Sequence, residues 1–290
     1  EQPVSYNAKV QTTHGNDELS RAAAKRVRSW RDKRFGIFVH FGLYAIPAKG
    51  EWIMWHDRIS PENYALLADQ FHPDYQAPSS WVQAAKSSGA KYMVVTAKHH
   101  DGFALFSSDS SDDFNSVKTK AGHDYIKEYV NAARKAGLAI GIYYSPLDWR
   151  YPGYFFPDLY QASAEQMRLK YHQQMLELMT RYGDIDIVWY DGGGENWLGF
   201  GGIDWKNATG WQTRSKTEGY KGRFSWLDNE LKDRLRAIQP NFIMSDRTSA
   251  DGDFKTREGE AALGDFDNER PWELATTLAG AWGYEEGKQP

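Results

Sequence analysis

The stretch Tyr92-Met-Val-Val-Thr-Ala-Lys-His-His-Asp101 begins with six strand-forming residues, nearly all apolar, and ends in four polar ones. A strand with one face in water alternates apolar and polar residues, whereas an unbroken apolar run is buried on both faces, as in a parallel sheet. The stretch therefore predicts a central parallel strand with chemically useful side chains directly after it.

Further runs of the same kind recur along the chain, and stretches of helical spacing separate them. The expected strands are 35–41, 92–97, 138–144, 185–190 and 242–245, with a sixth near 272–275. The expected helices are 17–33, 79–88, 123–136, 159–182 and 225–238. Gly89, Gly137 and Gly183 follow three of them, where a left-handed residue ends a helix. The alternation predicts an α/β fold and, within that class, the (β/α)8 barrel.

Eight strands at this spacing need more residues than the 290 of the chain. We therefore expect one domain over residues 1–290, a TIM-like barrel that is incomplete at its C-terminus. No repeat, linker or low-complexity tract marks a domain boundary.

Composition excludes several classes of function. The formal net charge is only -4 and no basic run gathers on one expected face, so nucleic acid is an unfavourable partner. No run approaches the roughly 18 apolar residues of a membrane span. The absence of Cys removes thiol catalysis, disulfides and thiolate metal sites. Because the chain starts at Glu1 without an apolar signal segment, we expect a mature exported protein, periplasmic, extracellular or lysosome-like, in which Asn207-Ala-Thr209 is a candidate glycosylation site.

Aromatic residues make up 15% of the chain, with 12 Trp and 17 Tyr. Flat rings with a polar edge stack well on sugar rings, so the composition suits carbohydrate binding. A Trp-rich core explains the same composition equally well.

In a (β/α)8 barrel the active site lies at the C-terminal ends of the strands. The polar residues there are His40, with Glu51 and Trp52 in the following loop, then Lys98 to Asp101, Tyr143 to Ser145, Trp189 to Asp191, and Asp246 with Arg247. A single histidine in such a place is usually structural, but three from two strands favour a functional site. Neighbours such as His99 and His100 point to opposite faces of an extended strand, so both reach one pocket only where the strand bends.

A metal site is an alternative use of His40, His99, His100 and Asp101, since imidazole and carboxylate are good zinc ligands. Adjacent histidines seldom reach one ion together, and the helical zinc spacing of two histidines around a glutamate is absent. The surrounding Trp and Tyr favour hydrogen bonds to sugar hydroxyls instead. We therefore expect no metal and no organic cofactor.

Asp191 directly follows the apolar run Ile187-Val-Trp-Tyr190, where an ionised carboxylate has a desolvation cost unless a partner offsets it. The three glycines 192–194 come next; they fit a turn, and they also clear space for a substrate. Its position after the fourth strand favours a catalytic carboxylate.

Glycoside hydrolysis usually needs a second, protonated carboxyl group. A dense acidic loop such as the one after Arg247 is more often a solvated surface, and the residues alone do not choose within it. The candidates are Asp251, Asp253, Glu258, Glu260, Asp265, Asp267, Glu269 and Glu273.

Several motifs together resemble the α-L-fucosidases of glycoside hydrolase family 29, in the family's order along most of the chain. They are Arg34-Phe-Gly-Ile-Phe-Val-His-Phe-Gly42, Gly50-Glu-Trp52, Lys91-Tyr-Met-Val-Val-Thr-Ala-Lys-His-His-Asp-Gly-Phe103, Gly141-Ile-Tyr-Tyr-Ser145, Val188-Trp-Tyr-Asp-Gly192 and Ser245-Asp-Arg247. The resemblance implies that Asp191 is the nucleophile. It also implies a fucose pocket lined by His40, Glu51, Trp52, His99, His100, Tyr144, Trp189 and Arg247.

For the acid/base, Asp253-Phe-Lys-Thr-Arg-Glu258 is similar to a family pattern and nominates Glu258. Family members often have Pro in place of Arg257, a cation that would lower the pKa of a group needed in its protonated form, and Glu260 is a rival. Pro271-Trp-Glu273 and Trp282-Gly-Tyr284 look like the family's sixth strand and following turn. The family's remaining barrel units and C-terminal β-sandwich are expected to be missing.

The resemblance implies a retaining, exo-acting α-L-fucosidase that removes terminal fucose from an oligosaccharide or glycoconjugate by double displacement. A non-catalytic fucose-binding protein on the same scaffold is the alternative, and a metal-dependent hydrolase is a further one.

Overall fold

The computed structural model describes residues 17–194, 197–199, 220–259 and 270–288. Within these ranges one sheet has the order β1-β2-β3-β4-β5, and β6 and β7 form a separate pair. All pairings between these strands are parallel, as the apolar runs predict. The strands are β1 Gly36–Val39, β2 Tyr92–Lys98, β3 Ala139–Tyr144, β4 Ile187–Tyr190, β5 Ile243–Met244, β6 Lys255–Glu258 and β7 Trp272–Ala275.

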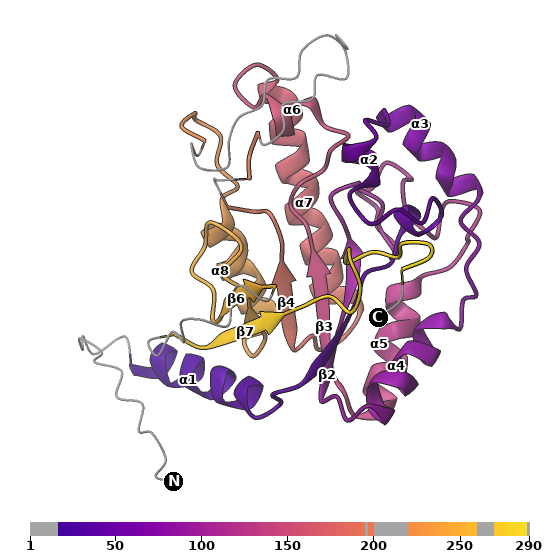
Figure 1. Ribbon diagram of the computed structural model, residues 1–290. Coiled ribbons are helices and arrows are strands. Elements are labelled where there is room, and N and C mark those ends of the chain that lie inside the picture. Colours follow the sequence, from indigo (N-terminus) through magenta and orange to yellow (C-terminus); the bar gives the residue numbers. More distant parts are fainter. Residues whose placement is uncertain (1–16, 195–196, 200–219, 260–269, 289–290) are drawn as a thin grey trace.

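Helices connect the strands, and α7 runs along the back of the sheet while α4 and α5 pack side by side next to it (Figure 1). The α-helices are α1 Asp17–Arg31, α2 Ile53–His56, α3 Pro61–Ala65, α4 Ala77–Ser87, α5 Tyr125–Ala136, α6 Pro152–Phe155, α7 Gln161–Arg181 and α8 Asp228–Ile238. Two 3-10 helices, η1 Leu43–Ala45 and η2 Leu66–Asp69, lie among them. In the described part of the chain, no helix combines the length and the apolar character needed to cross a bilayer.

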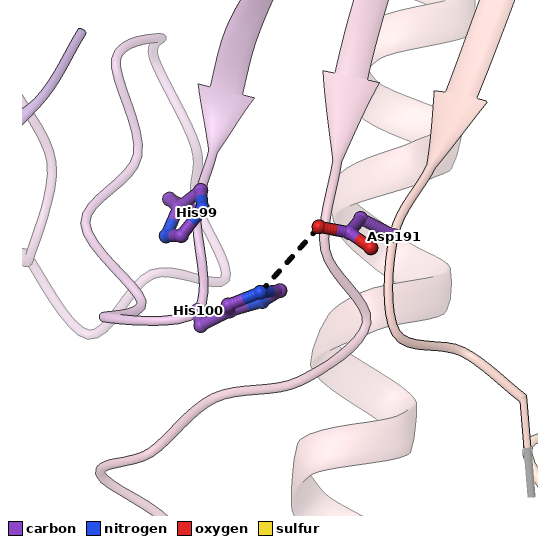
Figure 2. A group of neighbouring side chains, drawn as sticks. All are labelled: His99, His100 and Asp191. Carbon is purple, nitrogen blue, oxygen red and sulfur yellow. Dashed lines mark ion pairs between the residues drawn. The ribbon is translucent and has the colours of Figure 1, made fainter. Parts of the chain in front are cut away.

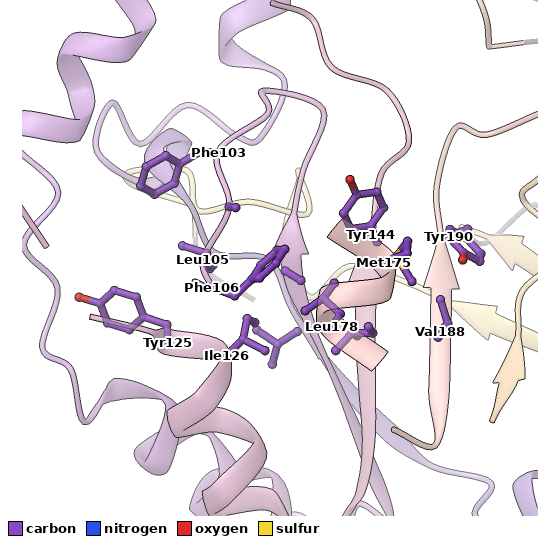
Figure 3. Packing of buried hydrophobic residues seen from close by; sticks show 14 of the residues in the cluster. Phe103, Leu105, Phe106, Tyr125, Ile126, Tyr144, Met175, Leu178, Val188 and Tyr190 are labelled. Atoms are coloured by element: carbon purple, nitrogen blue, oxygen red, sulfur yellow. The ribbon is translucent and has the colours of Figure 1, made fainter. Parts of the chain in front are cut away.

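The two faces of the sheet belong to separate apolar clusters, because successive strand residues point to opposite sides. The outer cluster packs the sheet against the helices, and Figure 3 shows Tyr144, Val188 and Tyr190 there beside Met175 and Leu178 of α7. The inner cluster takes the alternate strand residues. It comprises Trp30, Tyr92, Val94, Ala139, Tyr143, Ile187, Trp189, Ile243 and Phe254, with Phe38 packed against it.

Helix α1 lies across the end of the sheet at which the strands begin (Figure 1). Its Trp30 stacks on Phe254 with ring centroids 4.6 Å apart, and Arg26 forms an ion pair with Asp253 just before β6. The inner face is thus filled with apolar side chains at this end, which leaves the opposite end, where the strands finish, for polar side chains.

The expected strands and long helices are confirmed, but β6 was not predicted as a strand. Residues 255–258 lie in the acidic region that the sequence marks as a solvated loop. Their charged side chains hide the strand because β6 is short and only half-buried, so it needs no apolar run. Its partner β7 is the sixth strand expected near 272–275.

Candidate active site

A pocket with about 400 Å³ of empty space, part of it open to solvent, lies where the strands of the sheet end. Its walls come from segments far apart in the sequence, and they carry aromatic rings, imidazoles and three carboxyl groups. The lining residues are Phe38, His40, Glu51, Trp52, His99, Tyr143, Trp189, Asp191, Trp197, Arg247, Glu258 and Trp282. Eight of the ten site residues expected from the sequence are in this set; the other two are His100 and Tyr144.

The expected position of Tyr144 is wrong, and its neighbour Tyr143 lines the pocket instead. Tyr144 is on the outer face of β3, where its hydroxyl donates to Gln174 Oε1 of α7 at 2.7 Å. Tyr143 faces inward, where its ring stacks on the ring of Trp189 and its hydroxyl donates to Asp191 Oδ2 at 2.8 Å. Strand alternation implies that only one of the two tyrosines faces the pocket, and the pairing of Tyr143 with Trp189, two residues before Asp191, decides which one.

Asp191 stands at the end of β4, with its side chain 13% exposed, and has partners on both carboxylate oxygens. Arg247 Nη2 is 2.8 Å from Oδ1, and Oδ2 accepts from Tyr143. Oδ2 also lies 3.5 Å from His100 Nε2, the contact drawn in Figure 2. Burial alone would raise the pKa of Asp191, but the charge of Arg247, the electrostatic interaction with the facing His100 and the hydrogen bond from Tyr143 outweigh it and lower the pKa. The carboxylate is therefore held in its ionised form, as a nucleophile requires.

Arg247 links two of the three carboxyl groups of the pocket, those of Asp191 and Glu258. Its Nη2 pairs with Asp191 and its Nη1 with Glu258 Oε1, so one guanidinium contacts both. Glu258 has a 38% exposed side chain and stands at the end of β6. The sequence could not show this pairing, because Arg247 and Glu258 are brought together only by the fold of the β5–β6 connection.

The other described candidates for a second carboxyl group do not line the pocket. Asp253 pairs with Arg26 and Arg236 at the opposite end of β6, and Glu273 is half-buried on β7, where it accepts from Tyr92 and Trp189. Asp251 is exposed. Glu260, Asp265, Asp267 and Glu269 lie outside the described residues.

Arg257, the departure from the family pattern, lies on the side of β6 opposite to Glu258. Its guanidinium is 5.9 Å from the centre of the Trp272 ring. Successive residues of a strand point to opposite faces, so the cation next to Glu258 in space is Arg247 and not its sequence neighbour.

The bend expected at His99 and His100 is present. The pairing of β2 with β3 shifts register between Thr96 and Lys98, as at a β-bulge, which re-aims the side chains that follow. His99 packs flat against Tyr143 in the pocket wall, with centroids 5.4 Å apart. His100 comes to face Asp191 from just behind the wall (Figure 2).

His40 is half-buried and His99 is buried, and both are held neutral. Burial lowers the pKa of His40 to about 3, against the opposing charge of Asp191, and lowers the pKa of His99 well below its usual range. His99 Nδ1 is buried and lacks a hydrogen-bond partner among the described residues. A neutral imidazole in a pocket can donate a hydrogen bond to an uncharged hydroxyl with one nitrogen and accept one with the other.

Glu51 and Trp282 join distant parts of the chain at the pocket. Glu51 Oε2 accepts from the backbone N–H of Gly283 at 2.6 Å, and Trp282 stacks on His40 with centroids 5.5 Å apart. Burial raises the pKa of Glu51, while its hydrogen bonds from the backbone act in the opposite direction. The sequence analysis did not predict Trp282, Trp197 or Phe38 as site residues. Phe38 could have been predicted, because strand residues two positions apart point to the same face and Phe38 precedes His40 by two.

His99, His100 and Asp191 bring ligand-type atoms within 4.8 Å of one another, so by donor type they could hold a metal ion. Their contacts fit hydrogen bonding better. The carboxylate already faces the Arg247 guanidinium, whose charge opposes a second cation, and His100 Nδ1 is bonded to Ser145 Oγ at 2.6 Å. The expectation of no metal stays a prediction.

Comparisons with known proteins agree with this geometry. A family model described as alpha-L-fucosidase matches residues 4–290. The tissue alpha-L-fucosidase of Mus musculus is 34% identical over 182 residues, which are 57% of this chain and 40% of the mouse protein. The chain thus spans well under half of that relative.

Solved structures are similar over most of the chain. Alpha-L-fucosidase isoenzyme 1 from Paenibacillus thiaminolyticus has a TM-score of 0.73 and 34% identity, covering 92% of this chain and 64% of its own. Alpha-L-fucosidase AlfC from Lactobacillus casei in complex with alpha-L-fucose product has a TM-score of 0.68 and 27% identity, covering 91% and 83%. The likeness confirms the fold class expected from the sequence, that of a (β/α)8 barrel.

Proposed function

Because the chain belongs to the alpha-L-fucosidase family, we propose that it hydrolyses terminal α-L-fucosides with retention of configuration. The substrate class is a fucosylated oligosaccharide or glycoconjugate. Asp191 is the nucleophile and Glu258 the acid/base in this proposal.

The observation that carries the proposal is the shared guanidinium of Arg247, which contacts Asp191 and Glu258 at the pocket. Retaining enzymes need two carboxyl groups about 5 to 5.5 Å apart, whereas inverting enzymes leave room for a water molecule between carboxyl groups roughly 6.5–9.5 Å apart. Two carboxylates on adjacent nitrogens of one guanidinium favour the closer arrangement.

In the first step, an oxygen of Asp191 attacks the anomeric carbon while Glu258 gives its proton to the departing glycosidic oxygen. The bond to the aglycone breaks and a fucosyl ester of Asp191 forms. In the second step, Glu258 takes a proton from water, the hydroxide oxygen bonds to the anomeric carbon, and the ester bond breaks to regenerate the carboxylate.

Arg247 also favours the change of role of Glu258. Esterification removes the negative charge of Asp191, so the full charge of Arg247 then acts on Glu258. Its ionised form becomes more favourable at the moment at which it must accept a proton. The guanidinium thus responds to the state of the nucleophile without moving.

The rest of the pocket suits a neutral sugar. The rings of Trp52, Trp189 and Trp282 offer apolar faces to the C–H groups. His40 and His99, both neutral, offer hydrogen bonds to hydroxyls, and the unpartnered His99 Nδ1 gains a partner when a hydroxyl binds.

The test is turnover of 4-nitrophenyl α-L-fucopyranoside, the substrate named with a variant of AlfC, by the parent chain and by Asp191→Ala and Glu258→Ala. We expect a loss of at least about a hundredfold in each variant. Azide should restore Glu258→Ala with an α-fucosyl azide product, because it takes the place of water in the second step, and Asp191→Ala with the β anomer, because it takes the place of the nucleophile. A folded parent that binds fucose but shows no turnover would instead support the fucose-binding protein.

A further inference from the structure

Ser145 follows β3 directly, is fully buried, and does not line the pocket. Its hydroxyl oxygen lies 2.6 Å from Nδ1 of His100, whose other ring nitrogen faces Asp191 Oδ2 at 3.5 Å. These contacts form a line from a buried serine through an imidazole to the proposed nucleophile. We infer that Ser145 is a positioning residue that keeps an N–H of His100 directed at the nucleophile, an inference that rests on the proposed function of Asp191.

The protons that Asp191, His100 and Ser145 can carry decide the direction of these hydrogen bonds. An ionised carboxylate only accepts hydrogen bonds, so His100 faces it favourably only with a proton on Nε2. In the neutral ring that choice leaves Nδ1 as an acceptor, which needs a donor. The Ser145 hydroxyl is the group placed there, and its other acceptor among the described residues, Leu147 O, is more distant at 3.4 Å.

Without that donor the other tautomer becomes accessible. A proton on Nδ1 would turn the lone pair of Nε2 towards Asp191, which is repulsive. Loss of the hydroxyl therefore changes the electrostatic environment of the carboxylate although Ser145 itself does not touch it. The 3.5 Å separation is long for a hydrogen bond, as is common in sites without a bound substrate.

Lys98 fixes the backbone that carries this hydroxyl. Its Nζ donates to Ser145 O at 2.6 Å and Leu147 O at 2.7 Å, with His99 O at 3.4 Å. The Ser145 N–H donates to Lys98 O at 3.0 Å. The segment after β3 is thus bonded to the end of β2 on both sides of Ser145, so removal of the hydroxyl leaves these contacts intact.

The experiment compares Ser145→Ala with Ser116→Ala, a matched control. Ser116 is also fully buried, and its hydroxyl donates to His123 O at 2.6 Å away from the pocket. We expect Ser145→Ala to lower kcat by about ten- to a hundredfold with a smaller change in KM. The acid limb of its kcat/KM profile should move to higher pH, because Asp191 loses a favourable N–H. The control should lose stability only.

A double-variant cycle tests whether Ser145 acts through His100. In a His100→Phe background, Ser145→Ala should have no further effect on kcat. Independent, additive losses from the two changes would overturn the inference.

The tautomer can be read without turnover, which separates this inference from the proposed activity. Nitrogen-15 chemical shifts of His100 in the folded protein should place a proton on Nε2 in the parent, and a mixture or the Nδ1 form in Ser145→Ala. A parent ring protonated on Nδ1 alone, or on both nitrogens, would overturn the positioning role even if the protein is a fucosidase. If the nitrogen-15 shifts of His100 are as expected but the protein shows no turnover, the role of Ser145 in setting the tautomer stands and only the proposed activity is rejected.

Discussion

Tyr143 and Tyr144 are neighbours with the same side chain, yet β3 directs their hydroxyls to different partners. One donates to the carboxylate of Asp191, the other to the amide of Gln174 in the outer core. The two residues therefore offer a direct comparison of a contact in the pocket with a contact that stabilises the fold.

We expect Tyr143→Phe to lower kcat by about ten- to a hundredfold, since a hydrogen bond to a charged group contributes about 1.5–3 kcal/mol. Tyr144→Phe should leave kcat unchanged and destabilise the fold by about 1–3 kcal/mol, because Gln174 Oε1 loses its donor. Steady-state kinetics and urea unfolding of both variants give the comparison. The reverse pattern would place the substrate on the outer face of β3 and contradict the structure.

At the scale of elements, short segments place residues in the pocket by close packing. Helix α6 lies against α7, and Tyr154 of α6 donates to the backbone oxygen of Trp197 at 2.7 Å. Gly153 makes the approach possible, since a Cβ at this position would overlap the backbone of Ala164. The position of a pocket tryptophan thus depends on a glycine outside the pocket.

Gly153→Ala should destabilise the protein by about 1–3 kcal/mol, the usual cost of overpacking, and raise KM as α6 and Trp197 move. Gly137→Ala is the matched control. Gly137 ends α5 with φ 72° and has open space around it, so its substitution should cost only about 1 kcal/mol and leave KM unchanged. Equal effects of the two variants on KM would contradict the role of α6.

Across the whole molecule, Glu273 joins the β6–β7 pair to the main sheet. Its oxygens accept from Tyr92 of β2 at 2.6 Å and from the indole N–H of Trp189 at 2.8 Å. Burial raises its pKa, although both hydrogen bonds oppose the shift. The strand that pairs with β6 is thereby tied to the strand that precedes Asp191.

The raised pKa of Glu273 predicts a pH dependence of stability. The folded state holds the proton more tightly than the unfolded chain, whose value is about 4.3. The contribution of Glu273 is therefore fully present below about pH 4 and is lost as the pH rises through the folded pKa. Glutamine does not titrate and can still accept from Trp189.

Relative to wild type, the free energy of unfolding of Glu273→Gln should therefore increase as the pH rises above about 4.3. Urea unfolding at several pH values measures it. Glu165→Gln, an exposed change on α7, should run parallel to wild type. If the free energies of unfolding of Glu273→Gln and wild type differ by the same amount at every pH, the pKa of Glu273 is the same in the folded and unfolded states and the prediction is wrong.

The sequence by itself determined the α/β class, the strands β1 to β5 and β7, and the long helices, because apolar runs, helical spacing and glycine ends are local signals. It also located Asp191, His40, His99 and Arg247 at the strand ends, since the barrel places its site there. Tertiary structure alone decided which of two adjacent tyrosines faces inward, because that depends on the register of β3 against its neighbours.

The fold also decided which contacts complete the pocket. Arg247 contacts both Asp191 and Glu258, and Trp282 packs beside His40, although these residues are distant in sequence. A change of pairing between β2 and β3 redirects the side chain of His99. Electrostatic and packing interactions act through space, so no local pattern of residues records them.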